Sequence, residues 1–65
     1  MTISKDAFET NVLEILGPLH GVARRLTKNE ADAEDLVAES ITRAWRGRAS
    51  LADAGAFRAW IFRIL

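Results

Sequence analysis

The side chains that could perform catalysis are few in this chain of 65 residues. It has one histidine, His20, and no cysteine, so a structural zinc, a thiolate metal site and a disulfide framework are all excluded. Ser4, Ser40 and Ser50 would have to share that histidine, and no glycine-rich phosphate loop is present. A chain this short can hardly enclose a pocket of roughly 300 Å³. We therefore expect a binding module rather than an enzyme, with no catalytic residue, no metal and no cofactor.

A ridge of carboxylates is the first candidate binding surface. Asp32, Asp35 and Glu39 are spaced by three and four residues, which places them above one another on one face of a helix. The helix dipole explains the first two, which lie near the expected helix start. Glu39 lies farther along, where Arg43 can pair with it. On spacing alone, a solvated acidic face explains this acidic ridge better than a docking surface for a basic partner does.

Charge is distributed unevenly along the chain, although the formal net charge is zero. Residues 1–40 hold four basic and eight acidic residues, whereas residues 41–65 hold five arginines and one aspartate. The two parts therefore carry formal charges of −4 and +4. Such asymmetry suggests two partners on two surfaces, and arginine is the residue best suited to phosphate. Charge pairing within the fold would explain the asymmetry almost equally well.

Aromatic residues interleave with the C-terminal arginines, as in proteins that stack single-stranded bases beside a cationic groove. Phe57 and Trp60, however, share a helix face with Ile61 and Ile64, which favours a core position for Trp60. Phe62 points elsewhere and is the better candidate for an exposed ring.

The elements that must position these residues all read as helices. The pattern predicts an all-α fold, a small bundle of three to four helices with short connections. Ser4 can cap a first helix, Gly17-Pro18 should kink or break it, and a second piece should run to about Thr27. Asn29 can cap a third helix over residues 30–46, with Gly47 to end it. The expected buried face of this third helix consists of Ala33, Val37, Ile41, Ala44 and Trp45. A last helix should begin at Asp53 or Ala54.

The two ends of the chain give further expectations. No apolar run approaches the ~20 residues of a membrane helix, and no secretory signal opens the chain, which suggests a cytoplasmic protein without a membrane partner. The last helix reaches Ile64 and Leu65 without a cap, so we expect residues 1–65 to form one domain that is incomplete at its C-terminal end.

Phe62 and Leu65 of the last helix have no expected packing partner within the chain, which predicts self-association through this helix. His20 is expected to be a surface residue without a role.

Two segments resemble the second region of a bacterial RNA polymerase sigma factor of the extracytoplasmic-function class: ARRLTKNEADAEDLVAESITRAWR and, after a short loop, AFRAWIFRIL. The resemblance covers about Phe8 to Leu65, and the combination of DAEDLV, RAW and FRAWIFRI is specific. It implies a helical bundle whose acidic third-helix face docks on the clamp coiled coil of the polymerase's largest subunit. It also implies a later helix and preceding loop that engage the non-template strand of the upstream promoter element and help melt it in transcription initiation.

Carried over residue by residue, the resemblance implies two sets of site residues. The polymerase-binding residues are Asp32, Asp35, Leu36, Ala38 and Glu39. The DNA-binding residues are Arg46, Arg48, Ser50, Phe57, Arg58, Trp60, Phe62 and Arg63. Ala38 stands where the family usually has glutamine, which should weaken the clamp contact without abolishing it.

Other interpretations remain open on the sequence alone. Promoter DNA binding should be weak in this chain, and an anti-sigma factor is a further partner compatible with the resemblance. A helix-turn-helix repressor is disfavoured, because the connection from Gly47 to Asp53 is long and the helix after it is apolar. A stand-alone interaction module, acting as a clamp or anti-sigma decoy without promoter recognition, is harder to exclude.

Overall fold

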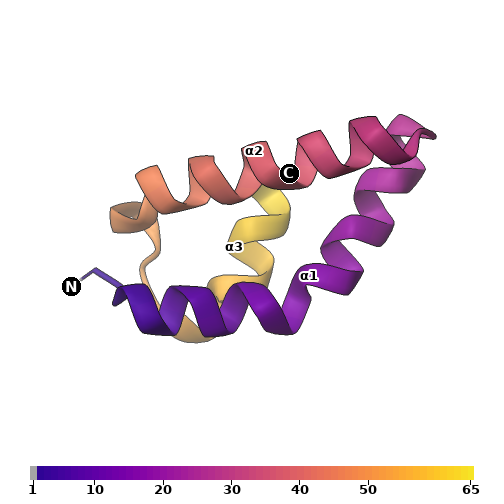
Figure 1. Cartoon of the computed structure of the whole chain (residues 1–65). Coiled ribbons are helices and arrows are strands. Elements are labelled where there is room, and N and C mark those ends of the chain that lie inside the picture. The colour runs from indigo at the N-terminus through magenta and orange to yellow at the C-terminus, as the bar shows by residue number, and fades with distance from the viewer. Residues whose placement is uncertain (1) are drawn as a thin grey trace.

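Three helices account for most of the computed structural model, which describes residues 2–65. They are α1 (Lys5–Thr27), α2 (Glu30–Arg46) and α3 (Phe57–Ile64). Two 3₁₀ turns, η1 (Arg48–Ser50) and η2 (Ala54–Ala56), connect α2 to α3. Figure 1 shows α1 and α2 as an antiparallel hairpin, with α3 crossing behind both. No strand occurs within residues 2–65, and the predicted small all-α bundle is confirmed.

The helix ends follow the predicted capping residues. The Ser4 side chain accepts a hydrogen bond from the Ala7 N–H at 3.1 Å, and Asn29 accepts one from the Asp32 N–H at 3.1 Å. These bonds satisfy amides that have no partner within their own helix. Only Lys28 and Asn29 separate α1 from α2, and Lys28 adopts the left-handed conformation with φ 58°. So short a turn makes the two helices antiparallel neighbours.

Pro18 lies inside α1 and does not end it, so of the two predicted outcomes, a kink or a break, the structure excludes the break. Proline has no N–H to donate to the carbonyl four residues earlier, and a helix that passes through it bends at that point. Figure 1 shows α1 changing direction near its middle. The buried stripe continues across the bend, from Ile15 on one side to Leu19 on the other.

The core is narrow where α1 and α2 meet and is closed by α3. Ala23, Ala33 and Ala44 are fully buried, which lets the two long helices approach closely. The buried hydrophobic residues are Phe8, Val12, Ile15, Leu19, Ala23, Ala33, Val37, Ala44, Leu51, Phe57 and Ile61. Across the described residues, no helix has the length and apolar character needed to cross a membrane.

Several residues placed in the core by the sequence lie elsewhere. Ile41 and Trp45 of α2 are only half-buried, and Ser40 occupies the buried face instead. Its hydroxyl donates to the Leu36 carbonyl at 2.7 Å, which satisfies the buried polar group within the helix itself. On α1, Leu16 and Leu26 are exposed, so the buried stripe of this helix is narrower than its apolar sequence pattern.

Candidate functional site

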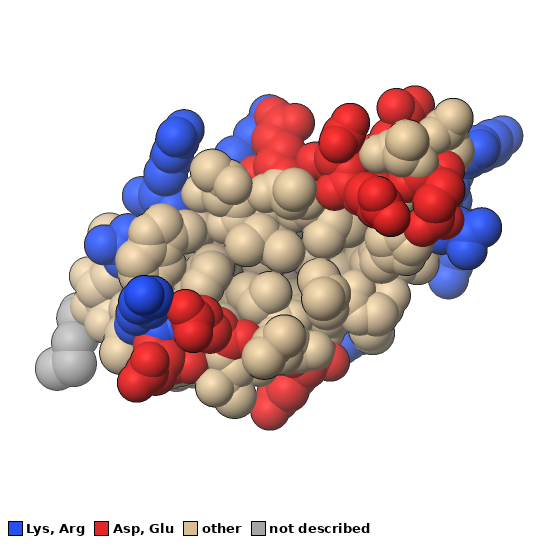
Figure 2. All heavy atoms as spheres, viewed as in Figure 1, with Lys and Arg blue, Asp and Glu red and all other residues tan. Residues whose placement is uncertain are grey.

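The acidic ridge of α2 is exposed along its whole length. Asp32, Asp35 and Glu39 all face solvent, and Figure 2 shows acidic side chains gathered along the part of the surface formed by α2. Arg43 pairs with Glu39, as the spacing predicted. Among the described residues, Asp32 and Asp35 make no ion pair. The ridge therefore retains two carboxylates that the fold does not neutralise.

The two uncharged members of the predicted polymerase-binding set face different ways. Ala38 is exposed and lines a hollow between α1 and α2 together with Leu16 and Val37. Leu36 is half-buried and packs against the core. The structure therefore leaves Asp35, Ala38 and Glu39 accessible on α2 and turns much of the Leu36 side chain inward.

An apolar groove runs between α1 and α2, and the sequence analysis did not identify it. Figure 2 shows a hollowed, largely uncharged surface between these helices, on the side opposite the one that α3 crosses in Figure 1. Leu13 and Leu16 lie along it and remain 72 % and 38 % exposed, with Ile41 across from them on α2. Glu9 and Glu34 are among its lining residues. Leu13 and Leu16 are three residues apart, a spacing that could have revealed this second apolar stripe.

The loop between α2 and α3 is held by two tryptophans. The Arg48 guanidinium lies 3.9 Å from the centroid of the Trp45 ring and donates to the Trp45 carbonyl at 2.7 Å. The Ser50 hydroxyl donates to the Gly47 carbonyl at 2.8 Å and accepts from Trp60 Nε1 at 3.1 Å. Two of the predicted DNA-binding residues, Arg48 and Ser50, thus have fixed positions in the isolated chain.

Phe57, one of the predicted DNA-binding residues, belongs to the core of the chain. Its side chain is 3 % exposed, packed 5.6 Å from Phe8 and 5.7 Å from Trp60 between ring centroids. A base would reach this ring only if the packing around it opened. Phe8 also contacts Trp45 at 5.1 Å, so the aromatic residues of all three helices are in contact.

The remaining predicted DNA-binding residues lie mostly at the surface. Arg58 and Arg63 of α3 and Arg46 of α2 are exposed, and no ion pair within residues 2–65 involves them. Arg58 lies 5.1 Å from the Phe62 ring centroid. Phe62, like Leu65, is half-buried against the core, so the expectation that these two side chains lack a partner within the chain is wrong.

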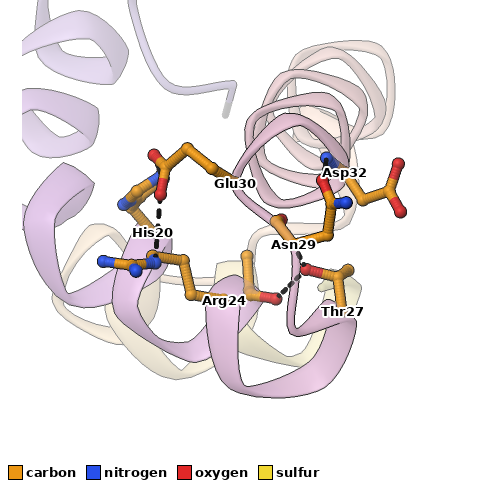
Figure 3. A network of polar contacts seen from close by, with 7 residues as sticks. His20, Arg24, Thr27, Asn29, Glu30 and Asp32 are labelled. Carbon is orange, nitrogen blue, oxygen red and sulfur yellow. Dashed lines mark hydrogen bonds and ion pairs between the residues drawn. The ribbon is translucent and has the colours of Figure 1, made fainter.

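His20 has a structural role that the sequence analysis did not assign. Its Nε2 lies 3.0 Å from Glu30 Oε1, and Arg24 Nε lies 3.1 Å from Glu30 Oε2 (Figure 3). Thr27 also donates to the Ala23 carbonyl at 2.8 Å and lies 3.1 Å from the Asn29 carbonyl oxygen. These contacts fasten the end of α1 to the beginning of α2.

Charge pairing inside the fold does not explain the uneven charge distribution. Of the three ion pairs in the described part of the chain, only Glu39–Arg43 joins residues 1–40 to residues 41–65. The acidic and basic surfaces therefore remain available to other molecules. No group of three or more potential metal ligands comes together among residues 2–65.

Comparison with known proteins adds one family assignment. The model of the sigma-70 region 2 family matches residues 12–65. The matched segment contains the acidic ridge, the loop between α2 and α3, and the whole of α3. Phe8 and the first two turns of α1 precede it. No solved structure gives a significant match.

Proposed function

Because the chain belongs to the sigma-70 region 2 family, we propose that its acidic ridge binds the clamp coiled coil of the largest subunit of RNA polymerase. Region 2 of a sigma factor is a non-enzymatic domain that acts in RNA polymerase binding and promoter melting, and this general role holds for the chain.

The observation that carries the proposal is the pair of unneutralised carboxylates, Asp32 and Asp35, on an exposed helix face beside Glu39. Carboxylates that the fold leaves unpaired can form charge-assisted hydrogen bonds with a basic partner. Ala38 and the apolar groove adjoin the ridge, and exposed Leu16 offers apolar surface to the same partner. A polar ridge flanking an apolar groove suits a helix that carries both basic and apolar side chains.

The second surface is the loop between α2 and α3 together with the exposed side of α3. We propose that Arg48, Ser50, Arg58 and Arg63 contact the single-stranded non-template strand of the upstream promoter element. Arginine provides bidentate contacts to phosphate, and the partly exposed Phe62 ring beside Arg58 offers a stacking surface. Arg46, also exposed, adds positive charge where α2 ends. Trp60 acts through Ser50, since its Nε1 is already bonded to that hydroxyl.

A titration calorimetry experiment with the isolated clamp coiled coil tests the polymerase contact. We expect Glu39→Lys to weaken binding by about 1–3 kcal/mol, or about 5- to 150-fold in Kd, because it removes a charge-assisted contact and adds repulsion. Glu14→Lys is the matched control, since Glu14 is exposed on α1 and lies outside the ridge and groove. Equal affinities for Glu39→Lys and the parent chain would contradict the proposal.

A second measurement distinguishes a domain that binds promoter DNA from an interaction module without promoter recognition. Fluorescence anisotropy with a single-stranded oligonucleotide should detect weak binding that falls as salt increases. A chain that binds the coiled coil but shows no DNA binding would instead be an interaction module without promoter recognition. An anti-sigma factor would have to compete for one of these two surfaces, and competition with the coiled coil tests that partner.

A further inference from the structure

Four aromatic rings form a continuous chain through the molecule, in the order Trp45, Phe8, Phe57, Trp60. The successive centroid distances are 5.1, 5.6 and 5.7 Å, and the rings come from all three helices. The two terminal members are the tryptophans that hold Arg48 and Ser50 of the loop. We call this set the aromatic chain.

Phe8 is the member that connects the two halves of the aromatic chain. It is 5 % exposed and contacts Trp45 with an interplanar angle of 64° and Phe57 with an angle of 79°. Both are edge-to-face arrangements, in which the ring quadrupoles favour one orientation over others. Phe8 therefore fixes how Trp45 and Phe57 lie, and Phe57 in turn contacts Trp60.

The loop has few other means of holding its polar side chains. η1 is three residues long and has no side-chain cap, and its backbone bonds, from Ser50 to Gly47 and from Leu51 to Arg48, are local. Leu51 is buried and anchors the end of the loop. Within residues 2–65, however, it forms no hydrogen bond with the side chain of Arg48 or Ser50. The two tryptophans do so, Trp45 from α2 and Trp60 from α3.

We propose that Phe8 is a positioning residue for the DNA-contacting loop, setting Arg48 through Trp45 and Ser50 through Phe57 and Trp60. The DNA-related part of this inference rests on the proposed function of the loop. Phe8 lies outside the segment that matches the family, so the family assignment gives it no role. The position of the loop then depends on a residue at least 40 positions before Arg48 and Ser50 in the chain.

Phe8→Leu is the test variant, because leucine keeps an apolar side chain in the core but has no ring edge. In the 65-residue chain we expect hydrogen exchange at the Ser50 and Leu51 amides to accelerate about fivefold or more, as a loss of local packing predicts. Affinity for a fluorescein-labelled 20-nucleotide single strand of randomised sequence should fall about threefold or more, while binding to the clamp coiled coil stays within about twofold.

Three further variants make the result specific. Ile15→Val removes a methyl group elsewhere in the core of α1 and should leave the loop amides and the DNA affinity as in the parent. Phe8→Tyr keeps the ring and should retain parent exchange rates, which shows that substitution at this position does not by itself loosen the loop. Phe8→Met, which fills space flexibly, replaces the leucine variant if that one does not fold.

Unchanged loop exchange in Phe8→Leu, or an equal acceleration in Ile15→Val, would overturn the inference. The failure of the proposed function has a different signature, namely a parent chain that binds no single-stranded DNA. In that case the exchange measurement still decides whether Phe8 positions the loop.

Discussion

Ile61 and Phe57 are the buried side chains of α3, and Ile61→Ala tests how much of the attachment of this helix depends on Ile61. α3 has eight residues, fewer than the ~12 that an isolated helix needs to be even marginally stable, so packing must hold it in place. Ile61 is 0 % exposed, and truncating such a residue to alanine costs about 2–5 kcal/mol. A chain of this size has a total free energy of unfolding of roughly 3–10 kcal/mol at 0.05–0.15 kcal/mol per residue. The variant should therefore lose a large part of its stability.

Urea denaturation followed by far-UV circular dichroism and tryptophan fluorescence measures the loss. With a slope of about 1 kcal/mol per molar urea for so small a domain, the midpoint should fall by roughly 2 M or more. Ile64→Ala is the matched control on the same helix, and its half-buried side chain should cost about 1 kcal/mol or less. If the two variants lose the same stability, the reasoning that α3 is held through Ile61 is refuted.

Four smaller predictions follow from individual contacts. Asn29→Ala should lower the free energy of unfolding by about 1 kcal/mol in urea titrations, since it removes the cap on the Asp32 amide; an unchanged midpoint would argue against that bond. Ala38→Gln should tighten binding to the clamp coiled coil in calorimetry, by restoring an amide beside the ridge; weaker binding would contradict the proposed contact. Affinity for single-stranded DNA should fall with a log–log salt slope of about −2 to −4 if a few arginines contact phosphates; a flat profile would exclude them. Phe62 and Leu65 pack against the core but stay partly exposed, and this remaining apolar surface predicts concentration-dependent association in sedimentation that Phe62→Glu abolishes; a parent that stays monomeric would refute self-association through α3.

The boundaries of α1 and α2 could be predicted because they depend on local chemistry, whereas α3 begins at Phe57, after the 3₁₀ turn Ala54–Ala56, and not at Asp53 or Ala54. Ser4, Asn29 and Gly47 occupy the predicted helix ends, where a capping side chain or an amide bonded within the last turn satisfies nearby backbone groups. The acidic ridge and its pairing with Arg43 follow from helical periodicity alone in the same way. Such features need no knowledge of which helix packs against which.

The features that the sequence did not reveal depend on contacts between helices. Pro18 could end a helix or bend it. Because α1 has buried residues on both sides of Pro18, the helix continues and bends. His20 acquires its role only when the turn brings Glu30 opposite it. The apolar groove exists because α3 covers one side of the α1–α2 hairpin and leaves Leu13 uncovered on the other. The burial of Phe57 likewise depends on the packing of Phe8 of α1 against it.

The two-residue turn between α1 and α2 has a consequence for the order of folding. Glu30 pairs with residues only six and ten positions earlier, so closing the hairpin costs little chain entropy. Docking α3 requires contacts such as Phe8 with Phe57, which are 49 positions apart and close a much longer loop. The α1–α2 hairpin should therefore be formed in the folding transition state, with α3 added afterwards. Substitutions at the turn would then slow refolding, whereas substitutions in α3 would mainly speed unfolding.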